Sequence, residues 1–263
     1  MHVSQDKRIV YDIPLEALPA YRGRRVIVRS HSPAAVVLAC RHVPDGDLAC
    51  VHLEGLPTDI EPLADWGYGL PIQLTMPDPA VEFPTLYRYA RLVDKHPVRV
   101  VTPVRRGFSR AVKLATSLEM AVKLDPGQPS PAELEELAAV LDFYLHGSAC
   151  SQPIEFFHGA LHALYRRESV TLREIQDDDP ARVRRVDADG VEWLGRHRAL
   201  VPETAACRTC EFWGLCAGYF KWPRRDYDCE AGIKALLRTL VAAAAELRSD
   251  VERFSAGVAD RAS

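Results

Sequence analysis

The sequence lacks the long apolar run and the excess of basic residues that mark many membrane proteins and nucleic-acid-binding proteins. No apolar stretch approaches the ~20 residues that a membrane-spanning helix needs. The N-terminal residues lack the hydrophobic region of a secretory signal. With 33 Lys and Arg residues against 36 Asp and Glu residues, the net charge is −3, which argues against a nucleic-acid-binding surface. We therefore expect a cytoplasmic protein whose partners are neither membranes nor nucleic acids.

Three short motifs of common enzyme classes are also missing. The chain has no G-x-S-x-G nucleophile elbow, no phosphate-binding P-loop and no G-x-G-x-x-G dinucleotide fingerprint. No short motif therefore points to serine hydrolysis or nucleotide binding.

The chain has the length and composition of an ordinary globular protein. Its 263 residues are 48% hydrophobic and 26% charged, which suits one barrel-sized unit with an appendage. Strands are expected at 25–29, 48–53, 70–76, 98–101 and 120–124. Helices are expected at 83–95, 107–118, 130–146 and 153–165. The run 34–40 fits either a short helix or a strand, because its periodicity decides neither.

Repeated strand–helix units predict a parallel sheet with right-handed crossovers. The part that carries them, about 24–168, is too short for eight full units of a closed barrel. We therefore predict an α/β fold in which residues 1–168 form a partial (β/α) barrel-like domain.

The organisation changes after residue 168. Val183–Val186 and Val191–Leu194 are expected to pair as a β-hairpin around Asp189-Gly190. From residue 233 onward, apolar residues recur at steps of four and three and predict a long C-terminal helix over 233–263. Its apolar face can pack on the barrel, which we favour, or form a dimeric coiled coil.

Four cysteines between these two elements carry the clearest chemical signal. Cys207, Cys210, Cys216 and Cys229 follow the spacing C-x2-C-x5-C-x12-C. Four thiolates are the ligand set of an iron–sulfur cubane or of a tetrahedral zinc ion. In a reducing cytoplasm, disulfides are the less favoured alternative.

The spacing favours one [4Fe–4S] cluster over Zn²⁺. Zinc ribbons usually oppose two C-x2-C knuckles, and this stretch has one. Three close ligands and one remote ligand are typical of cluster proteins, and aromatic residues around these cysteines would shield a cofactor from solvent. Zn²⁺ remains the alternative.

The C-x2-C-x5-C stretch, preceded by a hairpin and followed by a further cysteine and a helix, resembles the SPASM extension of radical-SAM peptide-modifying enzymes. In that family a partial (β/α) barrel carries an extension that binds auxiliary [4Fe–4S] clusters. The resemblance implies that residues 169–232 form a SPASM-like iron–sulfur region, in which Cys207, Cys210, Cys216 and Cys229 match the second auxiliary cluster.

The sequence also departs from that family. It has no C-x3-C-x2-C triplet for the radical-generating cluster, and Cys40 and Cys50 have no third partner. Where the family motif carries another cysteine, four residues after Cys216, this chain has Phe220. The chain thus resembles a pseudo-radical-SAM protein, with no S-adenosylmethionine site and no radical-SAM catalysis of its own.

A second candidate site is the pair Arg105-Arg106, which follows the strand expected at 98–101. Ligands of α/β sheets gather at this edge, so the two side chains are candidates to contact an anion or a peptide carboxylate.

The resemblance implies a companion protein of a peptide-modification pathway. Such a protein would bind a peptide or protein partner, such as a radical-SAM enzyme or a precursor peptide, or relay electrons through its cluster. The alternative is an enzyme or binding protein of unknown chemistry whose four-cysteine site holds a structural zinc ion.

Overall fold

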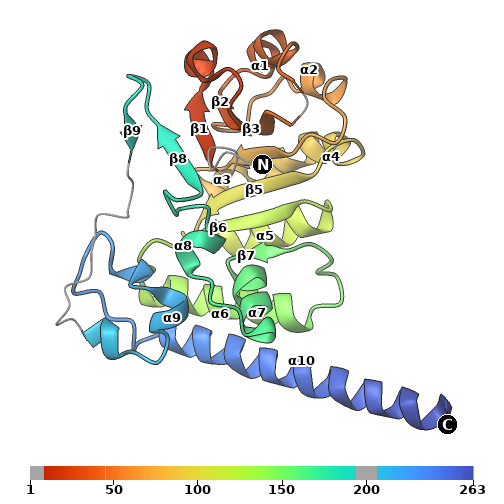
Figure 1. The fold of residues 1–263 in the computed structure, drawn as a ribbon, viewed down its shortest axis with the longest axis vertical. Helices are drawn as coiled ribbons and strands as arrows, with labels where there is room; N and C mark the ends of the chain where they lie inside the picture. The colour runs from red at the N-terminus through yellow and green to blue at the C-terminus, as the bar shows by residue number, and fades with distance from the viewer. Residues whose placement is uncertain (1–8, 45, 194–205, 263) are drawn as a thin grey trace, which may run out of the picture.

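The computed structural model describes residues 9–44, 46–193 and 206–262, and its central feature is one curled sheet (Figure 1). The sheet has nine strands in the order β7-β6-β5-β4-β3-β2-β1-β8-β9. Neighbouring strands from β7 to β8 are parallel, and β9 pairs antiparallel with β8. The strands are β1 (Val10–Pro14), β2 (Val26–Ser30), β3 (Leu48–Leu53), β4 (Ile72–Thr75), β5 (Val98–Pro103), β6 (Ala121–Asp125), β7 (Ile154–Glu155), β8 (Val183–Val186) and β9 (Glu192–Trp193).

The predicted fold class is confirmed at this level, because eight parallel strands form an α/β half-barrel. The helices are α1 (Pro33–Cys40), α2 (Glu61–Ala64), α3 (Pro79–Glu82), α4 (Ala90–Val93), α5 (Phe108–Ser117), α6 (Pro131–His146), α7 (Phe157–Arg166), α8 (Leu172–Ile175), α9 (Trp213–Cys216) and α10 (Ile233–Ala262). Short 3-10 helices cover Leu15–Tyr21, Phe83–Tyr89, Ala206–Thr209 and Tyr219–Lys221. Among the helices of the described ranges, none combines the length and apolarity of a membrane span.

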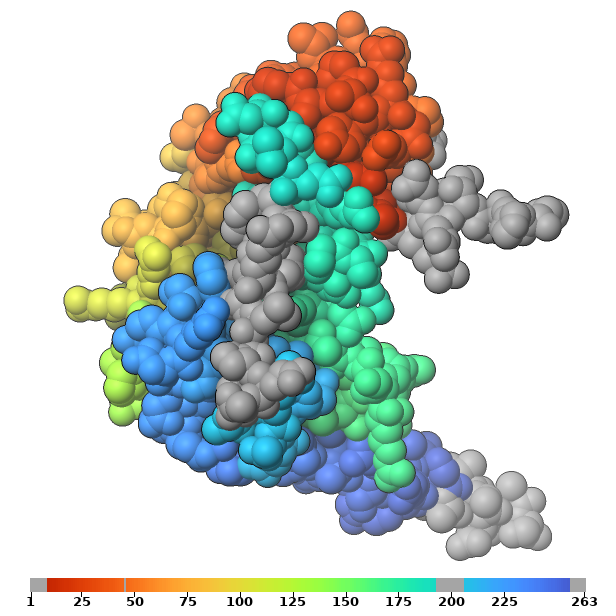
Figure 2. Space-filling model, turned by 60° about the vertical axis from the view of Figure 1, so that its left-hand side comes forward, coloured from red at the N-terminus to blue at the C-terminus, as the bar shows by residue number. Residues whose placement is uncertain are grey.

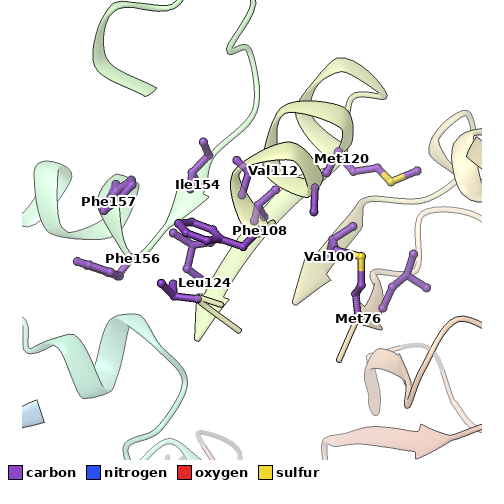
Figure 3. Close-up of a cluster of buried hydrophobic side chains, with 14 of the residues drawn as sticks. Met76, Val100, Phe108, Val112, Met120, Leu124, Ile154, Phe156 and Phe157 are labelled. Atoms are coloured by element: carbon purple, nitrogen blue, oxygen red, sulfur yellow. The ribbon is translucent and has the colours of Figure 1, made fainter. Parts of the chain in front are cut away.

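The convex face of the sheet forms the core. Successive side chains of a strand point to opposite faces, and the outward set is apolar and buried beneath the helices. Figure 3 shows this packing where α5 covers β5 and β6, with Phe108 and Val112 lying against Val100 and Leu124. The convex face is thus a continuous hydrophobic layer, and the concave face lies outside this core.

Local signals set the ends of several helices as predicted. Ser130 accepts a hydrogen bond from the Glu133 amide while the Glu133 carboxylate accepts one from the Ser130 amide, which is the expected capping box of α6. The ambiguous run 34–40 is helix α1, capped by the Ser32 hydroxyl. Gly107 opens α5 with φ +88°, and a Cβ there would lie 2.8 Å from the Ala80 Cα, so both conformation and space require glycine.

The sequence patterns did not predict two strands, β1 and β7, and they placed a third, β8, outside the barrel-like domain. β1 contains the charged Asp12, and β7 has only two residues, so neither gives a clear strand pattern. The predicted hairpin of β8 and β9 is present up to Trp193, and Leu194 lies outside the described residues. However, β8 also pairs in parallel with β1, so the half-barrel extends beyond the predicted boundary at residue 168. This pairing joins residues far apart in the chain and leaves no local signal.

Two helix predictions also need correction. The segment 83–95 is a 3-10 helix over Phe83–Tyr89 followed by α4, where one α-helix was expected. The segment expected to be helical from Pro153 first forms β7, and α7 begins only at Phe157.

The long C-terminal helix α10 packs on α7 and α6 through the first half of its apolar face. Ile233, Leu237, Leu240 and Ala244 are buried, as the favoured interpretation predicts. Leu247, Val251 and Phe254 continue the same stripe but are exposed. Figure 1 shows this half of the helix extending past the body of the molecule.

Candidate functional site

The four predicted ligands, Cys207, Cys210, Cys216 and Cys229, line a single cavity of about 220 Å³. Cys207 lies in the 3-10 helix Ala206–Thr209 and Cys216 in α9, Cys210 lies in the bend between them, and Cys229 lies in the segment just before α10. Figure 2 shows this segment in blue on the same face of the molecule as the turquoise β8–β9 hairpin. The structure therefore brings together the set of residues that the spacing suggested.

Tight turns shape the backbone that carries three of the cysteines. The amide of Cys210 donates to the Cys207 carbonyl at 3.0 Å, and the amide of Cys216 donates to the Phe212 carbonyl at 2.7 Å. After α9, Ala217 and Gly218 both adopt left-handed backbone conformations, with φ 45° and 74°, which reverse the chain. The Cys229 carbonyl accepts from the Lys234 amide at 3.0 Å, which ties the fourth ligand to the start of α10.

The surroundings of the cysteines combine buried apolar side chains with charges of both signs. Phe212, Leu215 and Phe220 are buried in this segment. Two lysines, Lys221 and Lys234, and two carboxylates, Asp228 and Glu230, line the cysteine cavity itself. Lys234 pairs with Glu230, so the charges of this lining partly compensate one another.

Burial favours the neutral form of two of these thiols, those of Cys216 and Cys229. Burial raises the pKa of Cys229 to about 11, with Lys221 acting in the opposite direction. Burial also raises the pKa of Cys216, while hydrogen bonds from the backbone of Phe220, Tyr219 and Gly218 act to lower it. Backbone donors directed at a sulfur are the kind of contact that stabilises a ligated thiolate.

The four cysteines that share this cavity are free thiols. Within the ranges that the structure describes, no three His, Cys, Asp or Glu side chains converge closely enough to hold a single metal ion.

The cysteine segment is fastened to the loop before α6. The Gln128 side-chain amide donates to the carbonyls of Phe220, at 2.9 Å, and Arg224, at 2.6 Å. Its oxygen accepts from the Arg224 amide at 3.2 Å. The Tyr227 hydroxyl donates to the Pro129 carbonyl at 2.8 Å. These contacts fix the cysteine cavity relative to the barrel.

A second and larger cavity, of about 660 Å³, occupies the concave side of the half-barrel, and sequence reasoning missed it. Nearly every strand contributes a polar or charged side chain to its lining. These residues include Asp12 (β1), His52 (β3), Gln73 and Thr75 (β4), Arg99 (β5), Lys123 and Asp125 (β6) and Arg185 (β8). A buried parallel sheet is ordinarily apolar on both faces, so this lining marks a site rather than a core.

One charged cluster lies on the β1–β3 side of the half-barrel cavity. Arg29 Nε lies 2.9 Å from Asp12 Oδ1, and Arg29 Nη1 lies 3.1 Å from Glu54 Oε1. Arg185 lies farther from the same two carboxylates, at 4.0 and 3.8 Å. Burial raises the pKa of Asp12, although Arg29 and Arg185 oppose the shift.

A second cluster lies on the β5–β6 side. Arg99 Nη2 donates to Gln73 Oε1 at 2.7 Å and lies 3.3 Å from Asp177 Oδ2. Lys123 Nζ lies 3.1 Å from the same Asp177 oxygen. Burial alone would raise the pKa of Asp177, but Lys123 and Arg99 outweigh it and lower the pKa below its usual value.

His52 lies on the floor of the cavity between the two clusters. Its Nε2 is 2.6 Å from the Thr75 hydroxyl. Burial, together with Arg185, Arg29, Lys123 and Arg99, lowers the pKa of His52 to about 3. The imidazole is therefore neutral at physiological pH, in a place that four cations surround.

The sequence did contain a signal for this cavity. Single charged or polar residues interrupt apolar strands, as Arg99 does in VRVV and Lys123 does in AVKL. Such positions become meaningful only once the strands are known to curl toward one another, because alternation alone does not say which face is enclosed.

The predicted pair Arg105-Arg106 lies elsewhere. Both side chains are exposed in the loop between β5 and α5. Neither belongs to the lining of the half-barrel cavity or of the cysteine cavity. The loop after β5 therefore does not form this site, whose lining comes mostly from residues within the strands.

Comparisons with protein-family models, with curated proteins and with solved structures found no match to this chain.

Proposed function

We propose that this chain is an iron–sulfur companion protein of a peptide-modification pathway, similar to radical-SAM peptide maturases but without their radical-generating cluster. The observation that carries the proposal is the cysteine cavity, which all four cysteines of the C-x2-C-x5-C-x12-C motif line together. The β8–β9 hairpin, the cysteine segment and α10 follow one another as in the SPASM-like region that the resemblance implies.

In this proposal Cys207, Cys210, Cys216 and Cys229 hold one [4Fe–4S] cluster. A bound cluster would supply either a rigid cross-link or a one-electron relay. The buried side chains of Phe212 and Leu215 would limit the access of water to it.

The position of Tyr219 supports a link between the two sites. Tyr219 lines the half-barrel cavity, and its neighbours Gly218 and Lys221 line the cysteine cavity. A peptide or protein partner bound at the half-barrel would therefore lie close to the cluster.

In this proposal a partner enzyme, and not this chain, carries out the radical chemistry. Cys40 lies in α1 and Cys50 in β3, and burial raises their pKa values to about 11 and about 12. Two separate, neutral thiols are poorly suited to hold the open cluster that S-adenosylmethionine cleavage requires.

Anaerobic purification followed by iron, sulfide and zinc analysis and visible absorption tests the proposal. We expect about four irons and four sulfides per chain, with a brown absorption that bleaches on reduction. Cys210→Ser and Cys229→Ser should lose this metal content, and Cys150→Ser, at a cysteine outside the cavity, should retain it. About one zinc per chain and no colour would instead indicate a structural zinc site and would contradict the proposed cluster.

A further inference from the structure

The half-barrel cavity has the features of a ligand site. Its volume of about 660 Å³ lies within the range of small-molecule sites, roughly 300–1,000 Å³. Its lining combines buried ion pairs that are costly to desolvate, whereas an apolar filling would stabilise the half-barrel more simply. A fold that keeps these charges in a cavity has retained them for recognition.

The charges are arranged so that cations surround the centre of the floor. The four charges that act most strongly on the His52 imidazole belong to Arg185, Arg29, Lys123 and Arg99. On the β5–β6 side, two cations share one carboxylate, that of Asp177. Arg99 and Lys123 thus converge on one carboxylate oxygen at the cavity wall, which Asp125 and Asp178 also line.

We propose that the half-barrel cavity binds a small ligand through an anionic group, a carboxylate or a phosphate, which Arg99 and Lys123 hold. Both side chains line the cavity and reach it from neighbouring strands. Arg99 supplies a planar fork of donors and Lys123 a compact charge, and both recognise such oxygens well.

Asp177 marks the place of that anionic group in the ligand-free protein. Its carboxylate already accepts from both cations, so the geometry for an anion oxygen exists there. Asp177 is 41% exposed and lies on the connection between α8 and β8, rather than in the sheet. An incoming anion would displace this carboxylate and take over its two partners.

Further carboxylates on both sides of the cavity restrict the rest of the ligand. Asp12 and Glu54 line the β1–β3 side, and Asp125 and Asp178 also border the cavity. These carboxylates disfavour a ligand that is anionic throughout, since like charges repel. We therefore expect one anionic group followed by hydrogen-bond donors, as in an amino acid, a peptide end or a phosphorylated small molecule.

The inference rests on the proposed function only in placing a partner at the half-barrel. Anion binding would persist whether the four cysteines hold iron, zinc or nothing. A negative metal analysis and a negative binding experiment are therefore separate results.

Titration calorimetry of the full chain with three probes tests the inference. The probes are inorganic phosphate, N-acetylglycine for a carboxylate, and N-acetylglycine amide as its neutral counterpart. We expect one of the two anions to bind and the neutral amide to bind at least about tenfold more weakly, since a charge-assisted contact is lost. Which anion binds more tightly identifies the group.

Variants connect the binding to the named residues. Arg99→Gln should weaken the binding of the preferred anion by about tenfold or more. Asp177→Asn should strengthen it, because the competing carboxylate is gone. Arg106→Gln removes the same charge from an exposed loop outside the cavity and should change nothing.

The result for Asp177→Asn keeps the inference falsifiable even if Arg99→Gln fails to fold. Unchanged or weaker anion binding in Asp177→Asn would reject the displacement. Failure of both anions to bind the wild-type chain, or equal binding of the neutral amide, would overturn the anion site as a whole.

Discussion

His52 shows at the scale of one residue how the half-barrel cavity differs from a core. It is buried on β3 beside Thr75, and surrounding cations and burial keep it neutral. In the unfolded chain its pKa returns to about 6.5. Between that value and the folded value of about 3, the unfolded state binds more protons than the folded state.

The sign of the pH dependence follows directly. The contribution of His52 to stability is fully present above about pH 6.5 and is lost progressively as the pH falls toward about 3. We predict that acidification lowers the stability of the His52→Gln variant less steeply than that of the wild type. The slopes of unfolding free energy against pH should differ by at most about 1.4 kcal/mol per pH unit. Thermal unfolding between about pH 4 and 7 measures it.

Comparison of the two proteins isolates His52 from other titrating groups. Asp12 has a raised pKa and so acts in the opposite sense, but it is present in both. Parallel pH curves for wild type and the glutamine variant would show that His52 is protonated as easily in the folded chain as in the unfolded one.

At the scale of secondary-structure elements, α10 has one apolar stripe in two environments. Leu237 is 1% exposed against the body, whereas Leu247 is 43% exposed on the same stripe. Leu237→Ala should cost about 2–5 kcal/mol of unfolding free energy through lost burial and a cavity. Leu247→Ala should cost less than about 1 kcal/mol, since solvent fills its place.

Urea unfolding of both variants compares the two positions directly. An equal cost at Leu247 would mean that the exposed half of α10 is covered in solution, as in a coiled-coil dimer. Sedimentation of the wild-type chain would then reveal the dimer.

Elements with strong local signals were predictable, and those that depend on distant partners were not. The capping box of Ser130 and the β-branched run of β5 specify their structures within a few residues. The two-residue β7 and the pairing of β8 with β1 exist only because the sheet curls. The same distinction applies to the sites, since the cysteine spacing is local while the concave lining is assembled from seven strands.

At the scale of the whole molecule, the side chain of Gln128 makes several of the contacts that join the cysteine segment to the half-barrel. Gln128 uses both its donors and its acceptor on backbone groups of Phe220 and Arg224. In the chain, Phe220 and Arg224 lie between Tyr219, which lines the half-barrel cavity, and Cys229, which lines the cysteine cavity. Loosening this contact should therefore move one cavity relative to the other without disturbing either core.

We predict that Gln128→Ala raises backbone hydrogen exchange over residues 219–227 while the strands of the half-barrel keep their protection. The loss of four hydrogen bonds should lower the local opening free energy by about 1–3 kcal/mol, and global stability should fall less. Gln128→Glu retains the acceptor for the Arg224 amide but loses the donors, so its exchange should be intermediate. Unchanged exchange in the alanine variant would mean that Tyr227 and the packing around Phe220 hold the segment in place, and that the two cavities are coupled through the hydrophobic contact instead.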